Sequence, residues 1–477
     1  MKTFGNSRQS GILLPVSCLP GRYGIGDFGP DVYKAIDIIK DCGFKIWQIL
    51  PLNPVGYGNS PYQSYSSFAG DEIYIDIDRL VSMGLIDHIN YGENKSDFIN
   101  YDTVRVFKTY YLNQAFEGFV ENDDYQQFVE EAFWLKDYAI FRALKAHHEG
   151  PWQDWSDSDY QDDDIRYHMF LQFVFYQQWM TIKEYANEKG ISIVGDLPIY
   201  VGLDSADVYS HPDNFLLDEN YYPTSVAGVP PDYFNDEGQL WGNPLYNWDH
   251  LKANHYDFWI NRLSWNQRLY DGIRIDHFRA FDTYWSVPVD SSTAKAGHWE
   301  LGPAYDLFDE IEARCPDLNL IAEDLGDLRP EVLELRDHYH LLGMRIVQYS
   351  FGKDERENNY LLPEYCIAYT GTHDNSPIVG WYEALPRLEK LRIRAIMRRH
   401  RHHGRKVTDR VIYHAFAEPS VLTIVPVQDL LRLGENARIN NPGTIGAPNW
   451  CWKLQSLNGL VDRIGEIRRL ISETNRL

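Results

Sequence analysis

Four acidic residues each follow a short apolar run, at the place where a strand of a parallel sheet would end. They are Asp196 in VGDLPIY, Asp276 in GIRIDHFRAF, Glu323 in LIAEDLG and Asp374 in YTGTHDN. A single acid of this kind is usually solvated or caps a helix. Four acids at like positions are instead expected to converge on one shared site.

Converging carboxylates suit the cleavage of a glycosidic bond. One carboxylate can attack the anomeric carbon while a second, kept protonated by its surroundings, donates a proton to the leaving oxygen. Arg274 precedes Asp276 by two residues and so shares its side of the strand, where its charge would keep Asp276 ionised. Metal binding is the rival interpretation, but no H-E-x-x-H motif or calcium-loop spacing accompanies these acids. We expect neither a metal nor a cofactor.

These acids require a frame of strands. Short, almost continuously apolar runs predict strands at 45–50, 191–195, 272–275, 319–322, 344–349, 367–369 and 421–425, with a possible eighth at 72–77. Such runs are typical of a parallel sheet covered on both faces. Helical patterns lie between them, for example at 30–42, with Pro30 at the first helical position and Gly43 just past the end. About eight strand-helix repeats predict an α/β fold of the (β/α)₈ barrel type rather than an open sheet.

Two spans are too long to be simple connections in such a barrel. Residues 85–190 carry mostly helical patterns, and residues 200–260 are rich in loops. We interpret residues 1–477 as one catalytic barrel that carries both spans as insertions.

Composition narrows the class of ligand. Lys and Arg total 45 against 69 for Asp and Glu, and the resulting net charge of −24 disfavours nucleic acid and anionic membrane surfaces. No apolar run approaches the ~18 residues that span a bilayer, so we expect a cytoplasmic protein. Its five cysteines are scattered without a C-x-x-C motif, which favours buried thiols. Aromatic residues reach 14%, many in loops such as YGNSPYQSYSSF, and suit stacking against neutral sugars.

Two further motifs are weighed and set aside. Gly24, Gly26 and Gly29 match G-x-G-x-x-G, but loop residues precede them where a dinucleotide site needs a strand, so they are interpreted as turn glycines. The basic run RLEKLRIRAIMRRHRHHGRK has apolar residues at helical spacing, which indicates one solvated helix face.

The motifs GIRIDHFRAF, IAEDLG and YTGTHDN resemble those of the amylomaltases, the 4-α-glucanotransferases of the α-amylase clan. Similar marks run along nearly the whole chain, among them SGILLPVSCLPGRYGIGDFG, NSPYQSYSSFAG and PVQDLLRLGENARINNPG. The resemblance implies a (β/α)₈ barrel with inserted subdomains and no C-terminal β-sandwich. It also implies a retaining enzyme that moves α-1,4-glucan segments between maltooligosaccharides without a cofactor.

The resemblance assigns roles position by position. Asp276 matches the nucleophile, Glu323 the general acid/base and Asp374 the carboxylate that stabilises the transition state. The expected substrate contacts are Arg274, His373, Asp196, Tyr62, Asn449 and the groove-covering aromatic residues Tyr233, Phe234 and Trp241. One departure is Ala304, which stands where glycine is usual in the family.

Three alternatives stay open at this level. A plain α-glucan hydrolase differs only in whether water or a sugar intercepts the intermediate, and the resemblance alone favours transfer. In a catalytically silent glucan-binding protein, at least one of the four acids is expected to be replaced. All four are present, which disfavours this alternative. A nicotinamide enzyme is the remotest alternative.

Overall fold

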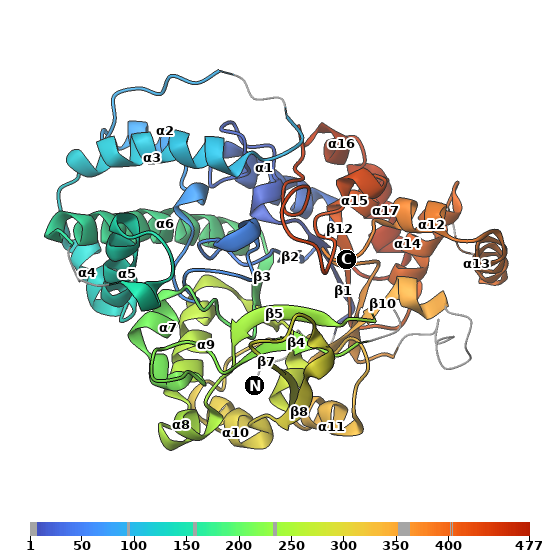
Figure 1. Cartoon of the computed structure of the whole chain (residues 1–477). Helices are drawn as coiled ribbons and strands as arrows, with labels where there is room; N and C mark the ends of the chain where they lie inside the picture. The colour runs from blue at the N-terminus through green and yellow to red at the C-terminus, as the bar shows by residue number, and fades with distance from the viewer. Residues whose placement is uncertain are drawn as a thin grey trace.

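The computed structural model describes residues 7–92, 96–155, 160–231, 236–351, 363–400, 402 and 404–477. Its centre is a closed barrel of parallel strands (Figure 1) in the order β1-β12-β11-β10-β9-β6-β3-β2. The strands are β1 Gln9–Leu13, β2 Ile46–Gln48, β3 Ser192–Leu197, β6 Gly272–Ile275, β9 Leu320–Ala322, β10 Leu342–Ile346, β11 Cys366–Tyr369 and β12 Leu422–Pro426. The predicted (β/α)₈ barrel is therefore confirmed.

Seven predicted strands correspond to barrel strands within a few residues, but the eighth prediction is wrong. Residues 72–77 form a 3₁₀ turn, Glu72–Tyr74, followed by the start of a helix. Asp71 and Asp76 accept hydrogen bonds from the backbone amides of Ile73 and Asp78, and these caps turn the chain away from an extended path. The eighth strand is instead β1, near the N-terminus.

Helices surround the barrel and fill the long connections. They are α1 Pro30–Cys42, α2 Ile77–Ser82, α3 Tyr101–Glu117, α4 Asp123–Glu131, α5 Leu135–His147, α6 Asp162–Glu188, α7 Ala206–Ser210, α8 Trp248–Ala253, α9 Asp257–Leu269, α10 Ala304–Arg314, α11 Pro330–His338, α12 Ile378–Ala384, α13 Arg387–Arg399, α14 Val407–Ala417, α15 Val427–Leu430, α16 Asn458–Val461 and α17 Ile464–Glu473. Helix α1 has the predicted bounds, because Pro30 suits its first turn and Gly43 ends it in the left-handed region at φ 96°.

A second sheet, which the sequence did not predict, stands beside the barrel. It is antiparallel, with strands β4 Ser225–Val229, β5 Gln239–Pro244, β7 Thr283–Pro288 and β8 His298–Leu301 in the order β5-β4-β7-β8. In Figure 1 this sheet lies in front of the barrel strands. The segment between β2 and β3 holds α2 to α6, and the segment between β3 and β6 holds α7, β4, β5, α8 and α9. Their interpretation as insertions stays a prediction.

The barrel closes between its first and last strands. Gln9 pairs with Leu422 and Leu13 with Pro426 in parallel register. Arg476, fully buried, fastens the seam by donating hydrogen bonds to the backbone oxygens of Gln9 and Glu418. The C-terminal residues therefore tie both edges of the seam together.

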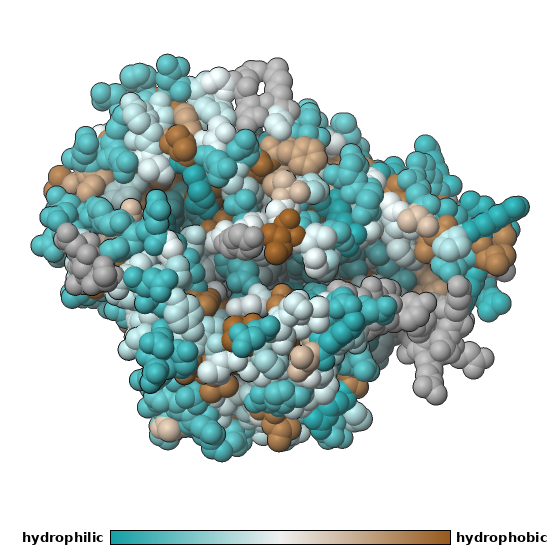
Figure 2. All heavy atoms as spheres, viewed as in Figure 1, coloured by the Kyte–Doolittle hydropathy of each residue, from teal (hydrophilic) through white to brown (hydrophobic). Residues whose placement is uncertain are grey.

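The surface seen in Figure 2 is mostly hydrophilic. Figure 2 shows one face on which hydrophilic residues prevail and hydrophobic ones are scattered. All five cysteines are buried free thiols, as expected. Among the described residues, no helix is both long enough and apolar enough to cross a lipid bilayer.

Candidate active site

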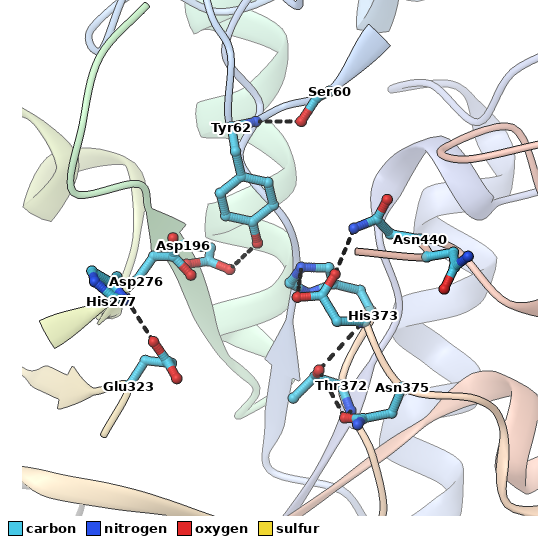
Figure 3. Close-up of polar contacts among 12 residues, drawn as sticks. Ser60, Tyr62, Asp196, Asp276, His277, Glu323, Thr372, His373, Asn375 and Asn440 are labelled. Atoms are coloured by element: carbon cyan, nitrogen blue, oxygen red, sulfur yellow. Dashed lines mark hydrogen bonds and ion pairs between the residues drawn. The ribbon is translucent and has the colours of Figure 1, made fainter. Parts of the chain in front are cut away.

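Two carboxyl side chains lie at the ends of the neighbouring strands β6 and β9. Asp276 directly follows β6, and Glu323 directly follows β9. The backbone amide of His277 donates a hydrogen bond of 2.7 Å to Oε2 of Glu323, and the amide of Leu325 donates one of 3.2 Å to Oε1. Both Glu323 oxygens are thus held by backbone donors, and Figure 3 shows the bond from His277.

A buried arginine joins Asp276 to the end of β3. Nη1 of Arg274 lies 2.6 Å from Oδ1 and 2.7 Å from Oδ2 of Asp196, and 3.0 Å from Oδ1 of Asp276. Asp196 and Arg274 are register partners in adjacent strands, so the pairing follows directly from the sheet. One guanidinium therefore contacts both carboxylates.

Tyr62 connects this cluster to the loop after β11. Its hydroxyl donates a hydrogen bond of 2.7 Å to Oδ2 of Asp196. Its ring stacks on His373, with centroids 5.2 Å apart and an interplanar angle of 18°, and Trp450 lies 5.8 Å away on a tilted plane. Figure 3 shows Tyr62 pointing between Asp196 and His373.

Asp374 lies next to His373, at the end of this series of contacts that begins at Asp196. Asn440 donates a hydrogen bond of 2.7 Å to its Oδ1, and Nε2 of His373 is 3.3 Å from its Oδ2. Arg438 donates to its backbone oxygen at 2.6 Å. The carboxylate is still 40% exposed and so accessible from the barrel mouth. The four predicted acids thus form one chain of contacts around that mouth.

The protonation states differ from those of exposed acids. Burial raises the pKa of Asp276 to about 7, against the opposing charge of Arg274, with Asp196 and Asp374 adding to the rise. Burial likewise raises the pKa of Glu323 to about 8, again opposed by Arg274. Arg274 does lower the pKa of Asp276 as expected, but burial outweighs it, so Asp276 titrates near neutrality instead of staying fully ionised.

The neighbouring histidines are neutral. Burial lowers the pKa of His277 to about 3 and also lowers the pKa of His373. Burial raises the pKa of Tyr62 well above its usual range, and Asp196 adds to the rise, which keeps the phenol a hydrogen-bond donor. The mouth therefore holds two acids whose pKa values are raised to near neutrality, that of Glu323 above that of Asp276.

Comparison with known proteins decides the family. A family profile described as 4-alpha-glucanotransferase matches residues 14–458. The 4-alpha-glucanotransferase of Clostridium butyricum is 40% identical over 95% of this chain and 99% of its own length. That of Thermus thermophilus is 38% identical over 98% and 99% of the two chains.

The chain belongs to the 4-alpha-glucanotransferase family. The solved structure of the amylomaltase from Streptococcus agalactiae, in complex with acarbose, agrees with a TM-score of 0.93 at 36% identity, covering 98% of this chain and 99% of that one. The amylomaltase resemblance, the transferase class and the fold are confirmed. The hydrolase, the silent binding protein and the nicotinamide enzyme are thereby set aside.

In this 4-alpha-glucanotransferase, the predicted aromatic cover is described only in part. Trp241, on β5, is half-buried, and its ring packs edge-on against His277 with centroids 4.8 Å apart. Gln63 donates a hydrogen bond to the Trp241 backbone oxygen at 3.1 Å. Tyr233 and Phe234 lie outside the described residues.

Asn449 lies in a tight loop rather than at a strand end. Its side-chain amide donates hydrogen bonds to the backbone oxygen and Oγ1 of Thr444 at 3.1 and 2.8 Å, and its oxygen accepts one from Asn441. The side chain is 5% exposed. These contacts order the loop near Trp450, and a direct substrate contact stays a prediction.

Sequence reasoning missed several residues that shape the site. His277, Asn440, Arg438 and Trp450 each contact a predicted site residue. The position of His277 directly after Asp276 was a usable signal, and so were the polar residues of the quoted motif RLGENARINNPG. Among the described residues, no group of three or more His, Cys, Asp or Glu side chains is arranged to hold a metal ion.

Proposed function

We propose that Asp276 is the nucleophile of a double displacement on α-1,4-glucans and that Glu323 is its acid/base. The observation that carries this proposal is the placement of two carboxyl groups with raised pKa values at adjacent strand ends, one beside Arg274 and one held by backbone amides. In the first step, protonated Glu323 donates its proton to the glycosidic oxygen as Asp276 attacks the anomeric carbon. The leaving glucan departs with a new hydroxyl, and a glycosyl ester forms on Asp276.

The second step reverses these roles. The 4-hydroxyl of an acceptor glucan gives its proton to the Glu323 carboxylate and attacks the anomeric carbon, which breaks the bond to Asp276 and releases its carboxylate. Oδ1 of Asp276 faces Arg274, so we assign the attack to Oδ2. The bond made replaces the bond broken, and Glu323 ends with the proton it first gave.

Asp374, Asp196 and Tyr62 are proposed to hold the donor sugar. The carboxylate of Asp374 is 40% exposed and is oriented by Asn440, which suits hydrogen bonds to sugar hydroxyls. Tyr62 contributes a ring face beside it, which suits packing against a pyranose. Trp241 is proposed to cover the site and exclude water, so that a bound acceptor competes with hydrolysis.

The test is incubation with maltotriose alone. Transfer conserves the number of reducing ends and yields glucose together with longer maltooligosaccharides. We expect that ladder with constant total reducing sugar. Rising reducing sugar with only shorter products would contradict the proposal.

Partners and location are proposed on different grounds. The net charge of −24 disfavours nucleic acid and membrane lipid, so we propose neutral glucans as the ligands. We also propose a cytoplasmic location, because no apolar run of the sequence is long enough to span a bilayer. Subcellular fractionation tests the location.

A further inference from the structure

A second pocket opens on the side of the molecule, lined by none of the residues assigned to catalysis. It has a volume of about 370 Å³ and lies between the start of α5, the end of α7 and the start of α9. Its volume is within the ~300–1,000 Å³ range of small-molecule sites. Ser66 and Phe68 contribute to its lining, and they belong to the same loop as Tyr62.

The pocket has an aromatic wall. The ring of Phe68 packs edge-on against Phe133, with centroids 5.4 Å apart, and edge-on against Phe258 at 6.1 Å. It also stacks on Trp134 at 6.3 Å and 14°. Phe133 is 54% exposed although it lines the pocket, whereas Phe68, Trp134 and Phe258 are buried. Phe133 therefore presents to the pocket a ring that packs against Phe68, and Trp134 and Phe258 support Phe68 in turn.

Polar groups also line the pocket. Three asparagines, Asn214, Asn254 and Asn261, line the pocket together with Ser210 and His211. Amides and hydroxyls both donate and accept hydrogen bonds, as sugar hydroxyls do. An aromatic face together with neutral polar groups is the combination that suits a pyranose ring.

The carboxylates in the pocket already have partners within the protein. Asp207 is buried and accepts hydrogen bonds from the backbone amide and hydroxyl of Ser67 at 2.8 and 2.7 Å. Asp257 pairs with Arg314 at 2.7 Å. Asp137 lies 3.6 Å from Nε2 of His211. Because these carboxylates already have partners, they attract a cationic ligand only weakly. Their negative charge repels an anionic ligand, so a neutral ligand fits best.

We propose that this pocket is a second glucan-binding site, which holds glucose units of a long chain outside the catalytic mouth. The choice of a glucan among neutral ligands rests on the proposed function. The Phe133 ring packs against one sugar face while the asparagine amides bind its hydroxyls. A long glucan that binds at two places on one enzyme gains apparent affinity, whereas maltotriose is too short to reach both sites.

The test compares Phe133→Ala with Tyr110→Ala. Tyr110, on α3, is a matched control because its ring is 59% exposed, packs edge-on against Tyr111 and lies outside the pocket. We expect Phe133→Ala to raise KM for amylose roughly five-fold, the loss of about one aromatic contact, with KM and kcat for maltotriose unchanged. Tyr110→Ala is expected to change neither. An unchanged KM for amylose in Phe133→Ala would overturn the proposal.

A direct binding measurement separates this proposal from the catalytic one. Calorimetric titration of the Asp276→Asn variant with maltoheptaose is expected to show two sites, and the double variant Asp276→Asn, Phe133→Ala one. Two equal isotherms from these variants would refute the second site whatever the catalytic role of Asp276. Absence of a product ladder from maltotriose in the unaltered enzyme would instead refute the proposed function and leave the titration valid.

Discussion

The backbone amide of His277 and the carboxyl group of Glu323 are joined by a 2.7 Å hydrogen bond across the gap between two barrel strands. His277 adopts φ 49° and ψ 47°, a left-handed conformation that costs a non-glycine residue roughly 1–2 kcal/mol. That conformation follows directly after Asp276, so a single peptide segment positions Asp276 and orients Glu323. Strain at this place is consistent with a site whose geometry matters more than its local stability.

The first prediction concerns Glu323→Gln. The amide cannot give or take the proton, so we expect kcat on maltotriose to fall by about 10²–10⁴, the usual contribution of acid/base catalysis. Far-UV circular dichroism and the melting temperature serve as controls for folding. Near-normal transfer by a folded variant would show that another group carries the proton.

The second prediction concerns pH. Catalysis requires ionised Asp276 and protonated Glu323, so kcat/KM is expected to rise as pH passes about 7 and to fall as it passes about 8. Because the two groups are close and interact, these values describe the pair. A profile that keeps rising well above pH 9 would contradict the assigned acid.

A substitution at Asp196 sharpens the pH prediction. The negative charge of Asp196 raises the pKa of Asp276, and Asp196 also shares Arg274 with it. Asp196→Asn keeps the shape and an acceptor for Tyr62 but removes that charge. We expect the acidic limb of the profile to move to lower pH, measured as kcat/KM from pH 5 to 9. A shift to higher pH would contradict this electrostatic assignment, whatever the change in overall rate.

The third prediction concerns Trp241. Its ring packs against His277 beside Asp276, so Trp241→Ala is expected to admit water and raise the ratio of hydrolysis to transfer several-fold. Reducing sugar measured beside the oligosaccharide ladder gives the ratio. Trp299→Ala is the matched control. Trp299 belongs to the same antiparallel sheet, but the strand register places it on the face opposite to that of Trp241. Equal ratios in both variants would reduce Trp241 to a packing residue.

The fourth prediction concerns Ala304, at the start of α10. Ala304 has φ 41°, in the left-handed region that favours glycine. Ala304→Gly is therefore expected to raise the free energy of unfolding by about 1 kcal/mol. Ala313→Gly, an exposed residue later in the same helix α10, should lower it by a similar amount. Urea unfolding of both variants measures the difference, and a loss of stability in both would show that Ala304 is not strained.

The local sequence pattern predicts the ends of most barrel strands within a few residues. The run GIRI forms β6 with the predicted bounds. Asp271 and Asp276 flank it on either side, and these acids limit where a buried parallel strand can begin and end. The position of each acid at the barrel mouth follows from its place after a strand. By contrast, the local pattern does not predict β1, because its short apolar run continues into a segment broken by Pro15.

Long-range contacts could not be predicted from local pattern. Asn440 reaches Asp374 across 66 residues, and Trp241 meets His277 only because β5 joins a separate antiparallel sheet. The pKa of Asp276 depends on burial by many segments at once, so the adjacent Arg274 alone gave an incomplete estimate of its charge. The types of the acting residues were visible in the sequence, but their electrostatic balance was not.

The seam between β1 and β12 also has a consequence for synthesis. Strand β1 can pair with β2 early, but its other edge finds β12 only after Leu422 has been made. At about 5–20 residues per second, the ribosome needs roughly twenty seconds to a little over a minute for the intervening chain. Throughout that interval the nascent chain displays an unpaired, apolar strand edge, which is a template for aggregation. We therefore expect the β1 edge to be the segment of the growing chain that chaperones most need to shield.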